Sequence, residues 1–254
     1  MAAGTYYLGQ GRVFSRIPGQ QGLHWWGDVS GLQLTATEET VSHRESYSGF
    51  RRKVRTISFI NEMTLTATIH QIDVNILAQV LRGTVIETPA GAVTSESLGT
   101  VAVGDVFKLE NGFNVDNVVI TDSAGTPVTI DPQHYDINAA SGLIEFFSLP
   151  TTAPTMPLLV SYEHGATRQV VFQNKEVEPI EIFFEGVNLA EGAAPVSCQL
   201  YRVKPGTLQN MALINDATAL ASLPWTGEVE ADTTKPANGM LGQIGRYIET
   251  LPEA

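Results

Sequence analysis

The segment from Ile57 to Ile69 alternates between apolar and polar residues, and this period constrains the fold more than any other feature of the chain. Successive side chains of a β-strand point to opposite faces, so a period of two indicates a strand with one buried and one solvated face. Only Ile60 and Asn61 interrupt the pattern. The even-numbered face contains Glu62, Thr64, Thr66 and Thr68. A shorter alternating run, Leu32 to Thr37, precedes it, and together the two runs predict a mainly β protein.

One short amphipathic helix is predicted directly after the long strand. Apolar residues recur at helical spacing between Asp73 and Arg82, and Gly83 follows as the expected C-terminal residue. From Pro89 to Gly165 the pattern changes to short β runs separated by turn residues, which is typical of a small β-sandwich. Alternation resumes at Thr167. We therefore expect a helix that flanks the larger sheet and an Ig-like β domain inserted into it.

These patterns divide the 254 residues into four predicted parts. Residues 1–28 are rich in Gly and Gln and are expected to form an extended N-terminal arm. Residues 29–93 and 166–232 are expected to form one discontinuous β-sandwich domain, interrupted by the inserted domain at 94–165. Residues 233–254 contain Gly and Pro and are expected to form a loosely held C-terminal tail.

A basic stretch, His43 to Arg55, lies between the two alternating runs of an acidic chain. It contains five basic residues and one acidic residue, a net of +4, which leaves −16 on the remainder of a chain whose formal charge is −12. Such a stretch is often a solvated loop. The contrast with the acidic remainder indicates instead a contact with another copy of the chain. The candidate residues are His43, Arg44, Glu45, Arg51, Arg52, Lys53 and Arg55.

No catalytic or cofactor motif is present in the sequence, so we expect neither an enzyme nor a bound cofactor or metal. The nearest approach to a cation site is Asp131, His134 and Asp136, although Asp131-Pro132 also makes an ordinary turn. Cys198 is the single cysteine, and its alternating surroundings indicate a buried structural thiol. No signal peptide or apolar run of membrane length is found, so a soluble protein made in the cytoplasm is expected, without a membrane partner.

Several short motifs together resemble the major tail tube protein of long-tailed, non-contractile bacteriophages. They are Trp26-Gly-Asp-Val-Ser-Gly-Leu-Gln-Leu34, Glu38-Glu39, His43-Arg-Glu-Ser-Tyr-Ser-Gly49, the Thr-rich strand and Leu81-Arg-Gly83. The resemblance covers residues 23–83 well and 167–230 loosely. The segment Val101 to Tyr162 is similar to small β domains that decorate some of these tubes.

The resemblance implies a β-sandwich subunit of the virion tail that forms hexameric rings. The rings stack into a tube, genomic DNA passes through the lumen without specific binding, and a tape measure protein and a tail terminator are further partners. The long loop at about residues 38–53 would join successive rings. The candidate lumen-facing residues are Glu62, Thr64, Thr66, Thr68, Glu181 and Glu185; plain solvent exposure explains the three glutamates equally well.

A different class of protein remains as an alternative. The inserted domain could make the chain a receptor- or carbohydrate-binding virion module, since such modules present aromatic side chains beside Asp or Asn. The candidate aromatics are Phe113, Tyr135 and Phe147, although packing in the core of the small domain is the favoured explanation for all three. The acidic composition, with a formal charge of −12, argues against general nucleic-acid binding in either case, because that binding requires Lys and Arg to displace counterions.

Overall fold

The computed structural model describes residues 6–17, 19–215, 220–237 and 239–250. Strands dominate these residues and pair antiparallel, with one α-helix, so the predicted mainly β fold is confirmed. The chain forms two compact units. Unit 1 comprises Met1–Val85 and Val170–Ala254, and unit 2 comprises Ile86–Gln169. No helix in the described part of the chain is long and apolar enough to cross a membrane.

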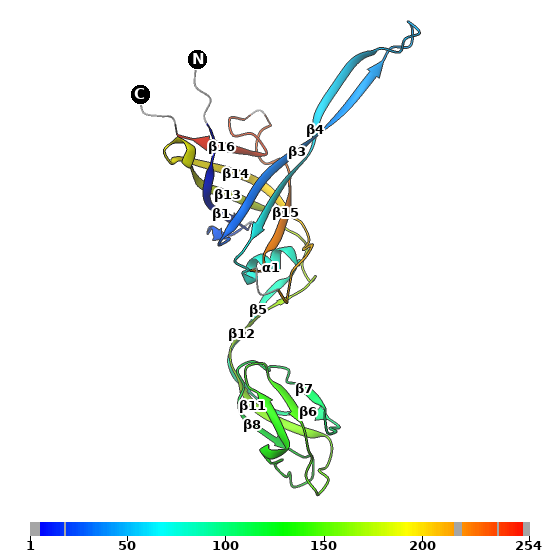
Figure 1. Cartoon of the computed structure of the whole chain (residues 1–254), viewed down its shortest axis with the longest axis vertical. Helices are drawn as coiled ribbons and strands as arrows, with labels where there is room; N and C mark the ends of the chain where they lie inside the picture. Colours follow the sequence, from blue (N-terminus) through cyan, green and yellow to red (C-terminus); the bar gives the residue numbers. More distant parts are fainter. Residues whose placement is uncertain (1–5, 18, 216–219, 238, 251–254) are drawn as a thin grey trace. The chain divides into compact units, whose positions relative to one another are not determined.

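Unit 1 is built on one large antiparallel sheet with the strand order β2-β1-β13-β14-β15-β4-β3, and β16 pairs with β14 (Figure 1). The sheet curls around a core on its inner face. Its strands are β1 (Gly9–Arg16), β2 (His24–Trp25), β3 (Val29–Arg44), β4 (Lys53–Ile69), β13 (Ile180–Asn188), β14 (Ala194–Pro205), β15 (Leu223–Val229) and β16 (Gly245–Glu249).

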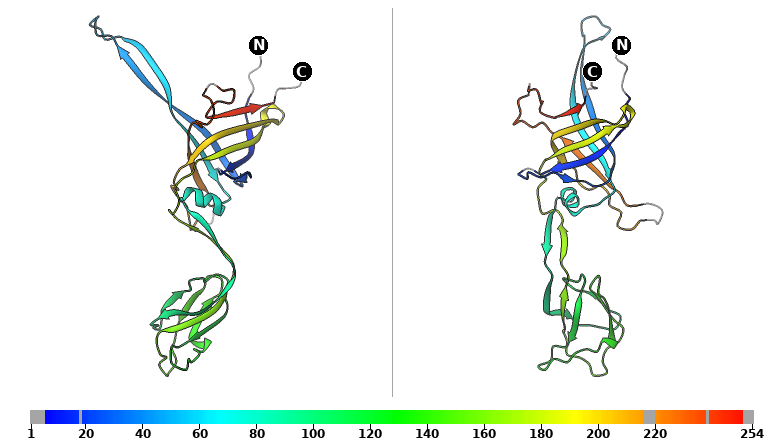
Figure 2. Two further views of the ribbon diagram at one scale, coloured as in Figure 1. Left: turned by 180° about the vertical axis from the view of Figure 1, so that it is seen from behind. Right: turned by 90° about the vertical axis from the view of Figure 1, so that its left-hand side faces the viewer.

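The core of unit 1 is closed by helix α1 (Val74–Val80), which lies under one end of the curled sheet (Figure 2). Asp73 caps the helix, because its carboxylate accepts the backbone N–H of Asn75 at 3.2 Å. Ile76 and Val80 are buried against the sheet. Trp26 and Trp225 pack edge to face in the same core with ring centroids 4.7 Å apart, which fills a large volume.

The helix ends differently from the sequence prediction. Arg82, not Gly83, adopts the left-handed conformation after the C-terminal turn, with φ of 52°. Gly83 is required for another reason: a Cβ atom there would lie 2.3 Å from the backbone oxygen of Val171. The glycine therefore allows two chain segments to approach closely, and its role could not be read from local sequence alone.

Both ends of the chain contribute strands that the sequence pattern does not predict. The expected N-terminal arm contains β1, which pairs with β13 from Gly9 to Arg16. Its period is hidden because Gly9 and Gly11 carry no side chain, and a Cβ at Gly11 would lie 2.2 Å from the backbone oxygen of Glu185. The expected C-terminal tail contains β16, which pairs with β14 from Gly245 to Glu249. β1 and β16 are therefore part of the large sheet.

Unit 2 contains two three-stranded antiparallel sheets around a second core. One has the order β6-β11-β8 and the other β7-β10-β9. The strands are β6 (Gly91–Gly99), β7 (Val106–Lys108), β8 (Asp116–Thr121), β9 (Tyr135–Asn138), β10 (Leu143–Phe146) and β11 (Leu158–His164). The fully buried side chains include Leu109, Ile120, Ile130, Ile144, Phe146, Leu158 and Val160. The sequence placed the insertion at 94–165, whereas the compact unit starts at Ile86 and ends at Gln169.

The chain crosses between the units twice, in β5 (Thr84–Thr88) and β12 (Thr167–Val171), which pair as a two-stranded sheet. Arg168 forms an ion pair with Glu87, with 2.6 Å between the charged atoms. Within unit 2, Gly91 lies opposite His164 at the first residue pair of β6 and β11. The entry and exit of the insertion are therefore adjacent.

A buried carboxylate, Asp122, organises one end of unit 2. Its two oxygens accept the backbone N–H groups of Val128 at 2.7 Å and Thr155 at 3.2 Å. The hydrogen bond from Val128 is the main reason that the pKa of this carboxylate lies below its usual value. The ionised carboxylate accepts these N–H groups more strongly than the protonated acid would, so the charge stabilises the turn after β8.

Replacing Trp26 by alanine should lower the free energy of unfolding of unit 1 by about 3–5 kcal/mol, because the substitution removes a fully buried indole and leaves a cavity. Urea denaturation followed by circular dichroism measures this loss. The neighbouring Trp25 is 51% exposed, compared with 1% for Trp26. The Trp25→Ala control should cost about 0.5 kcal/mol or less; equal losses in the two variants would contradict this account of the core.

Unit 2 should lose stability in acid through Asp122. Because its folded pKa is lowered, its contribution is present above the unfolded pKa of about 3.9 and is lost as the pH falls through the lower folded value. Hydrogen exchange of peptides from residues 116–162 measures this. Asp122→Asn should increase exchange at pH 7 and flatten the dependence below pH 4. Asp136→Asn, an exposed control, should leave both unchanged; a flattened profile in the control instead would refute the assignment.

Candidate functional site

The predicted polar residues of the long strand lie on one face of the large sheet, opposite the core. Leu65, Ala67 and Ile69 of β4 are buried, whereas Thr64, Thr66 and Thr68 alternate with them on the other face. The register extends this polar row sideways. Thr66 lies between Gln33 of β3 and Thr226 of β15, and Thr64 lies between Thr35 and Glu228. Glu62 continues the same face toward the end of the sheet.

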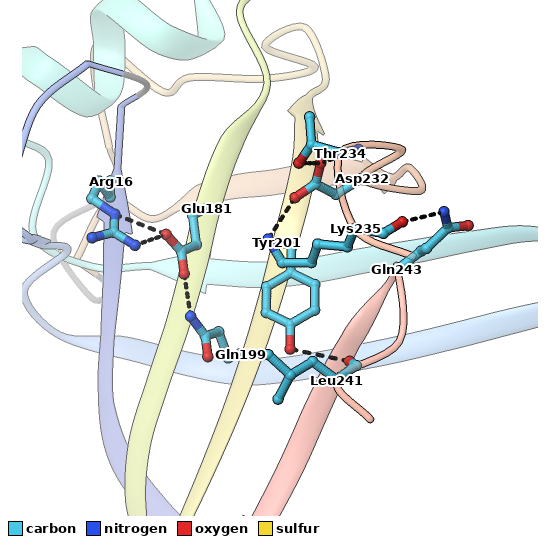
Figure 3. Close-up of polar contacts among 9 residues, drawn as sticks. All are labelled: Arg16, Glu181, Gln199, Tyr201, Asp232, Thr234, Lys235, Leu241 and Gln243. Atoms are coloured by element: carbon cyan, nitrogen blue, oxygen red, sulfur yellow. Dashed lines mark hydrogen bonds and ion pairs between the residues drawn. The ribbon is translucent and has the colours of Figure 1, made fainter. Parts of the chain in front are cut away.

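Glu181 and Glu185 of β13 are on this same polar face, but each is paired with an arginine of β1. The Nη2 atom of Arg12 lies 3.0 Å from the carboxylate of Glu185. The Nε atom of Arg16 donates to Glu181 at 2.8 Å, and Gln199 of β14 donates to the other oxygen of Glu181 (Figure 3). These contacts form a polar ladder across three strands, which the sequence could not show because Arg16 and Glu181 are 165 residues apart.

The polar face is consequently mixed in charge rather than acidic. β1 belongs to the sheet and adds arginines beside the predicted threonines and glutamates. The carboxylates are Glu62, Glu181, Glu185 and Glu228, and the basic side chains on the same face are Arg12, Arg16, Lys204 and Arg246. The Arg12–Glu185 pair is exposed, and an exposed ion pair contributes about 0–1 kcal/mol, so its main effect is on the local potential.

The segment after β15 is fixed against the same side of β14 (Figure 3). Lys235 donates to Asp232 at 2.7 Å and lies 4.5 Å from the ring centroid of Tyr201, whose hydroxyl donates to the backbone of Leu241. The hydrogen bond from Lys235 lowers the pKa of Asp232 to about 2. This network fixes Asp232, Lys235 and Leu241 to β14 where the chain returns to β16.

The predicted basic loop is the tip of a long β-hairpin formed by β3 and β4. His43 and Arg44 end β3, Lys53 and Arg55 begin β4, and the turn at residues 45–52 connects them. All the basic side chains of the tip are exposed. Arg52 lies over the ring of Phe50, 5.1 Å from its centroid, and Arg44 donates to the backbone oxygen of Arg51 at 3.3 Å.

Glu45 differs from its predicted role as a contact residue. It is buried in the turn, where its carboxylate accepts the hydroxyl of Ser48 and its backbone N–H donates to Arg52 at 3.0 Å. The hydrogen bond from Ser48 is the main cause of the lowered pKa of Glu45. The residue therefore stabilises the turn from within, and the outer surface of the tip is left to the cations.

A β-bulge at Asn61 exchanges the two faces of the hairpin. Thr37 pairs with Glu62, but the next residue of β3, Glu38, pairs with Ile60, so Asn61 has no partner across the ladder. On the tip side of the bulge, Ile57 and Phe59 lie on the same face of β4 as Thr64, Thr66 and Thr68, which lie on the core side of the bulge. The expectation that the whole odd-numbered row from Ile57 to Ile69 would pack on the core was therefore wrong for these two residues.

The exposed apolar residues beyond the bulge form a cluster that we call the hairpin cluster: Val41, Ile57 and Phe59. Val41 pairs directly with Ile57, and Phe59 lies two residues farther along the same face. Their exposed fractions are 56%, 53% and 47%. Scattered apolar residues on a surface are common, but a cluster on a paired strand face indicates a contact surface.

The residues considered for metal or thiol chemistry have structural roles. Asp131 caps a short 3-10 helix, η1 (Pro132–His134), and the Nδ1 atom of His134 lies 2.8 Å from the Ser148 hydroxyl. Among the described residues, no group of three His, Cys, Asp or Glu side chains is arranged to hold a metal ion. Cys198 lies half-buried in β14, and burial raises the pKa of its thiol, which disfavours the nucleophilic thiolate.

The aromatic residues of the alternative carbohydrate-binding hypothesis are divided between core and surface. Tyr135 is buried against Phe146, with ring centroids 5.8 Å apart. Phe113 and Phe147 are about half exposed, and Lys108 lies 5.9 Å from the ring of Phe113. The suggestion that all three fill the core is wrong for these two phenylalanines. No second aromatic ring pairs with either of them among the described contacts.

Comparison with known proteins gives one result that covers almost the whole chain. No curated protein matches the sequence. A family model matches residues 6–248, which include every strand of unit 1 apart from the last residue of β16, and all of unit 2. The two units and the hairpin are therefore features of one family sequence rather than a chance fusion. The chain belongs to the family described as "Protein of unknown function UCP028589".

Proposed function

We propose that the chain is a non-enzymatic structural subunit of a bacteriophage tail, the major tail tube protein, which assembles with copies of itself into stacked hexameric rings. The observation that carries the proposal is the β3–β4 hairpin. Its outer half is fully paired within itself, has no core beneath it, and exposes both an apolar cluster and a basic tip. Such an element gains little stability from its own chain, so a contact with another copy accounts for its length.

The polar face of the large sheet supports the second part of the proposal, a tube lumen. Thr64, Thr66 and Thr68 form a row of short hydroxyl side chains beside paired Arg and Glu residues. A face with few unpaired cations offers a DNA duplex little counterion release, so DNA would pass without binding. Unit 1 of each subunit joins its neighbours in the tube through the edges of its large sheet. Unit 2 is an accessory domain.

The same proposal assigns the remaining partners. The tail tube would act in the virion tail, with a tape measure protein inside it during assembly and a tail terminator at its end. These partners follow from the resemblance of residues 23–83 to tail tube proteins and from the proposed role. The basic tip, with a net charge of +4 against −16 on the rest of the chain, favours contact with an acidic surface of a neighbouring copy.

Purified protein should polymerise into hollow tubes with a fixed axial repeat, visible by negative-stain electron microscopy. Polymerisation should increase with concentration, because each added copy buries hairpin surface that is exposed in the monomer. A protein that stays monomeric at high concentration, with the tape measure protein supplied, would contradict the proposed function.

Reversing three charges at the tip, R51E/R52E/K53E, should block tube formation while the subunit stays folded. The change takes the stretch from +4 to −2 and replaces attraction to an acidic surface by repulsion. Microscopy measures the tubes, and circular dichroism with size-exclusion chromatography checks the fold. The matched control R51K/R52K keeps the charge and should still assemble. Normal tubes from the triple variant would exclude an electrostatic role for the tip.

A further inference from the structure

A large apolar groove opens in unit 1 between β1 and β3, the strands near the two ends of the curled sheet. Its volume is about 950 Å³. The floor comes from the inner face of the sheet and consists of Leu34, Leu65, Phe184, Cys198, Leu200 and Tyr247. Leu65 and Leu200 are buried at the bottom of the groove, whereas Leu34 and Tyr247 are 46% and 53% exposed along it, so the groove presents apolar side chains to solvent above the core. An opening of this size and composition is suited to several apolar side chains.

Both walls of the groove have backbone edges available for pairing. β3 is the last strand at its end of the sheet, and at the other end β1 is covered only by the two-residue β2, at Phe14 and Ser15. From Gly9 to Arg12 the outer edge of β1 has no strand beside it among the described residues. An uncovered edge next to an apolar floor is a place where a further strand can bind.

The hairpin cluster is an exposed apolar surface on the same chain, and it could fill an apolar groove of this kind. It cannot reach the groove of its own chain. Leu34 of the groove and Val41 of the cluster lie on the same continuous strand, seven residues apart, which separates them by about 23 Å. The ladder between β3 and β4 is paired on both sides of the cluster, so the hairpin does not fold back. A second copy is required to bring the two apolar surfaces together.

We infer that the groove between β1 and β3 of one copy receives the hairpin cluster, Val41, Ile57 and Phe59, of a second copy. This inference rests on the proposed function and identifies the surface of the neighbouring subunit that the hairpin contacts. Donor and acceptor are different surfaces of the chain, so the contact is heterologous and can repeat without limit. The basic tip beyond the cluster extends past the groove toward the acidic remainder of the acceptor.

The single cysteine of the chain provides a direct test, because Cys198 lies in the floor of the groove. Phe59→Cys places a thiol in the cluster. Its matched control, Ser58→Cys, is the adjacent exposed residue on the opposite face of the hairpin, where Ser58 pairs with Thr40. After assembly and mild oxidation, F59C should form disulfide-linked multimers on a non-reducing gel at least about ten times more than S58C. Peptide mass spectrometry should identify the bond between position 59 and Cys198.

Replacing Phe59 removes an apolar side chain of the cluster and could itself weaken the contact, so the test also uses a cysteine at position 41 and the reactivity of Cys198. Val41→Cys should cross-link to Cys198 in the same way, and adding Cys198→Ser to either variant should abolish the multimers. In the wild-type protein, maleimide should alkylate Cys198 several times more slowly in assembled tubes than in monomers. Tubes that form normally but show equal alkylation, with no bond to Cys198 from position 41 or 59, would overturn this inference and leave the proposed function intact. Absence of tubes would remove the basis of both.

Discussion

The hydrogen-bonded ladder between β3 and β4 is the constraint on which the rest of unit 1 depends. It runs from the pair Val29 and Ile69 beside the core to the pair Arg44 and Lys53 at the tip. Hydrophobic burial stabilises only its inner half, where Leu65, Ala67 and Ile69 contact Trp26, Trp225 and α1. The outer half is held by backbone hydrogen bonds and cross-strand contacts, which stabilise a two-stranded ribbon only weakly. The ribbon is thus a continuation of the core strands, positioned by the packing of their inner ends.

The bulge at Asn61 divides this ribbon into two surfaces with different chemistry. On the inner side of the bulge, one face is apolar and buried and the other holds the Thr row. On the outer side, the apolar residues appear on the face of the threonines. One unpaired residue is enough for this, since a shift of one residue exchanges the faces of a strand. A single sequence can in this way provide both a core and an outward-facing contact surface on one strand.

Local periodicity predicted the long strand, the helix, the β character of the insertion and the shared face of Thr64, Thr66 and Thr68. The break at Ile60 and Asn61 was visible in the sequence, but its meaning depended on the pairing with Glu38, which only the register shows. β1 was missed because Gly9 and Gly11 remove the alternating side chains that mark a strand. The ladder from Arg16 through Glu181 to Gln199 was missed because its members come from three distant segments. Local patterns determine strands, whereas the site arises from their long-range pairing.

The adjacent entry and exit of unit 2 make it separable from the large sheet. Within unit 1, the two segments that lead to it are already held together, because Gln173 donates to the backbone of Leu81 and Lys175 donates to Arg82, each at 3.0 Å. Removing the insertion would leave two chain ends that a short turn can join. Unit 2, between Val85 and Val170, could therefore be replaced by a different domain without altering the strands of unit 1.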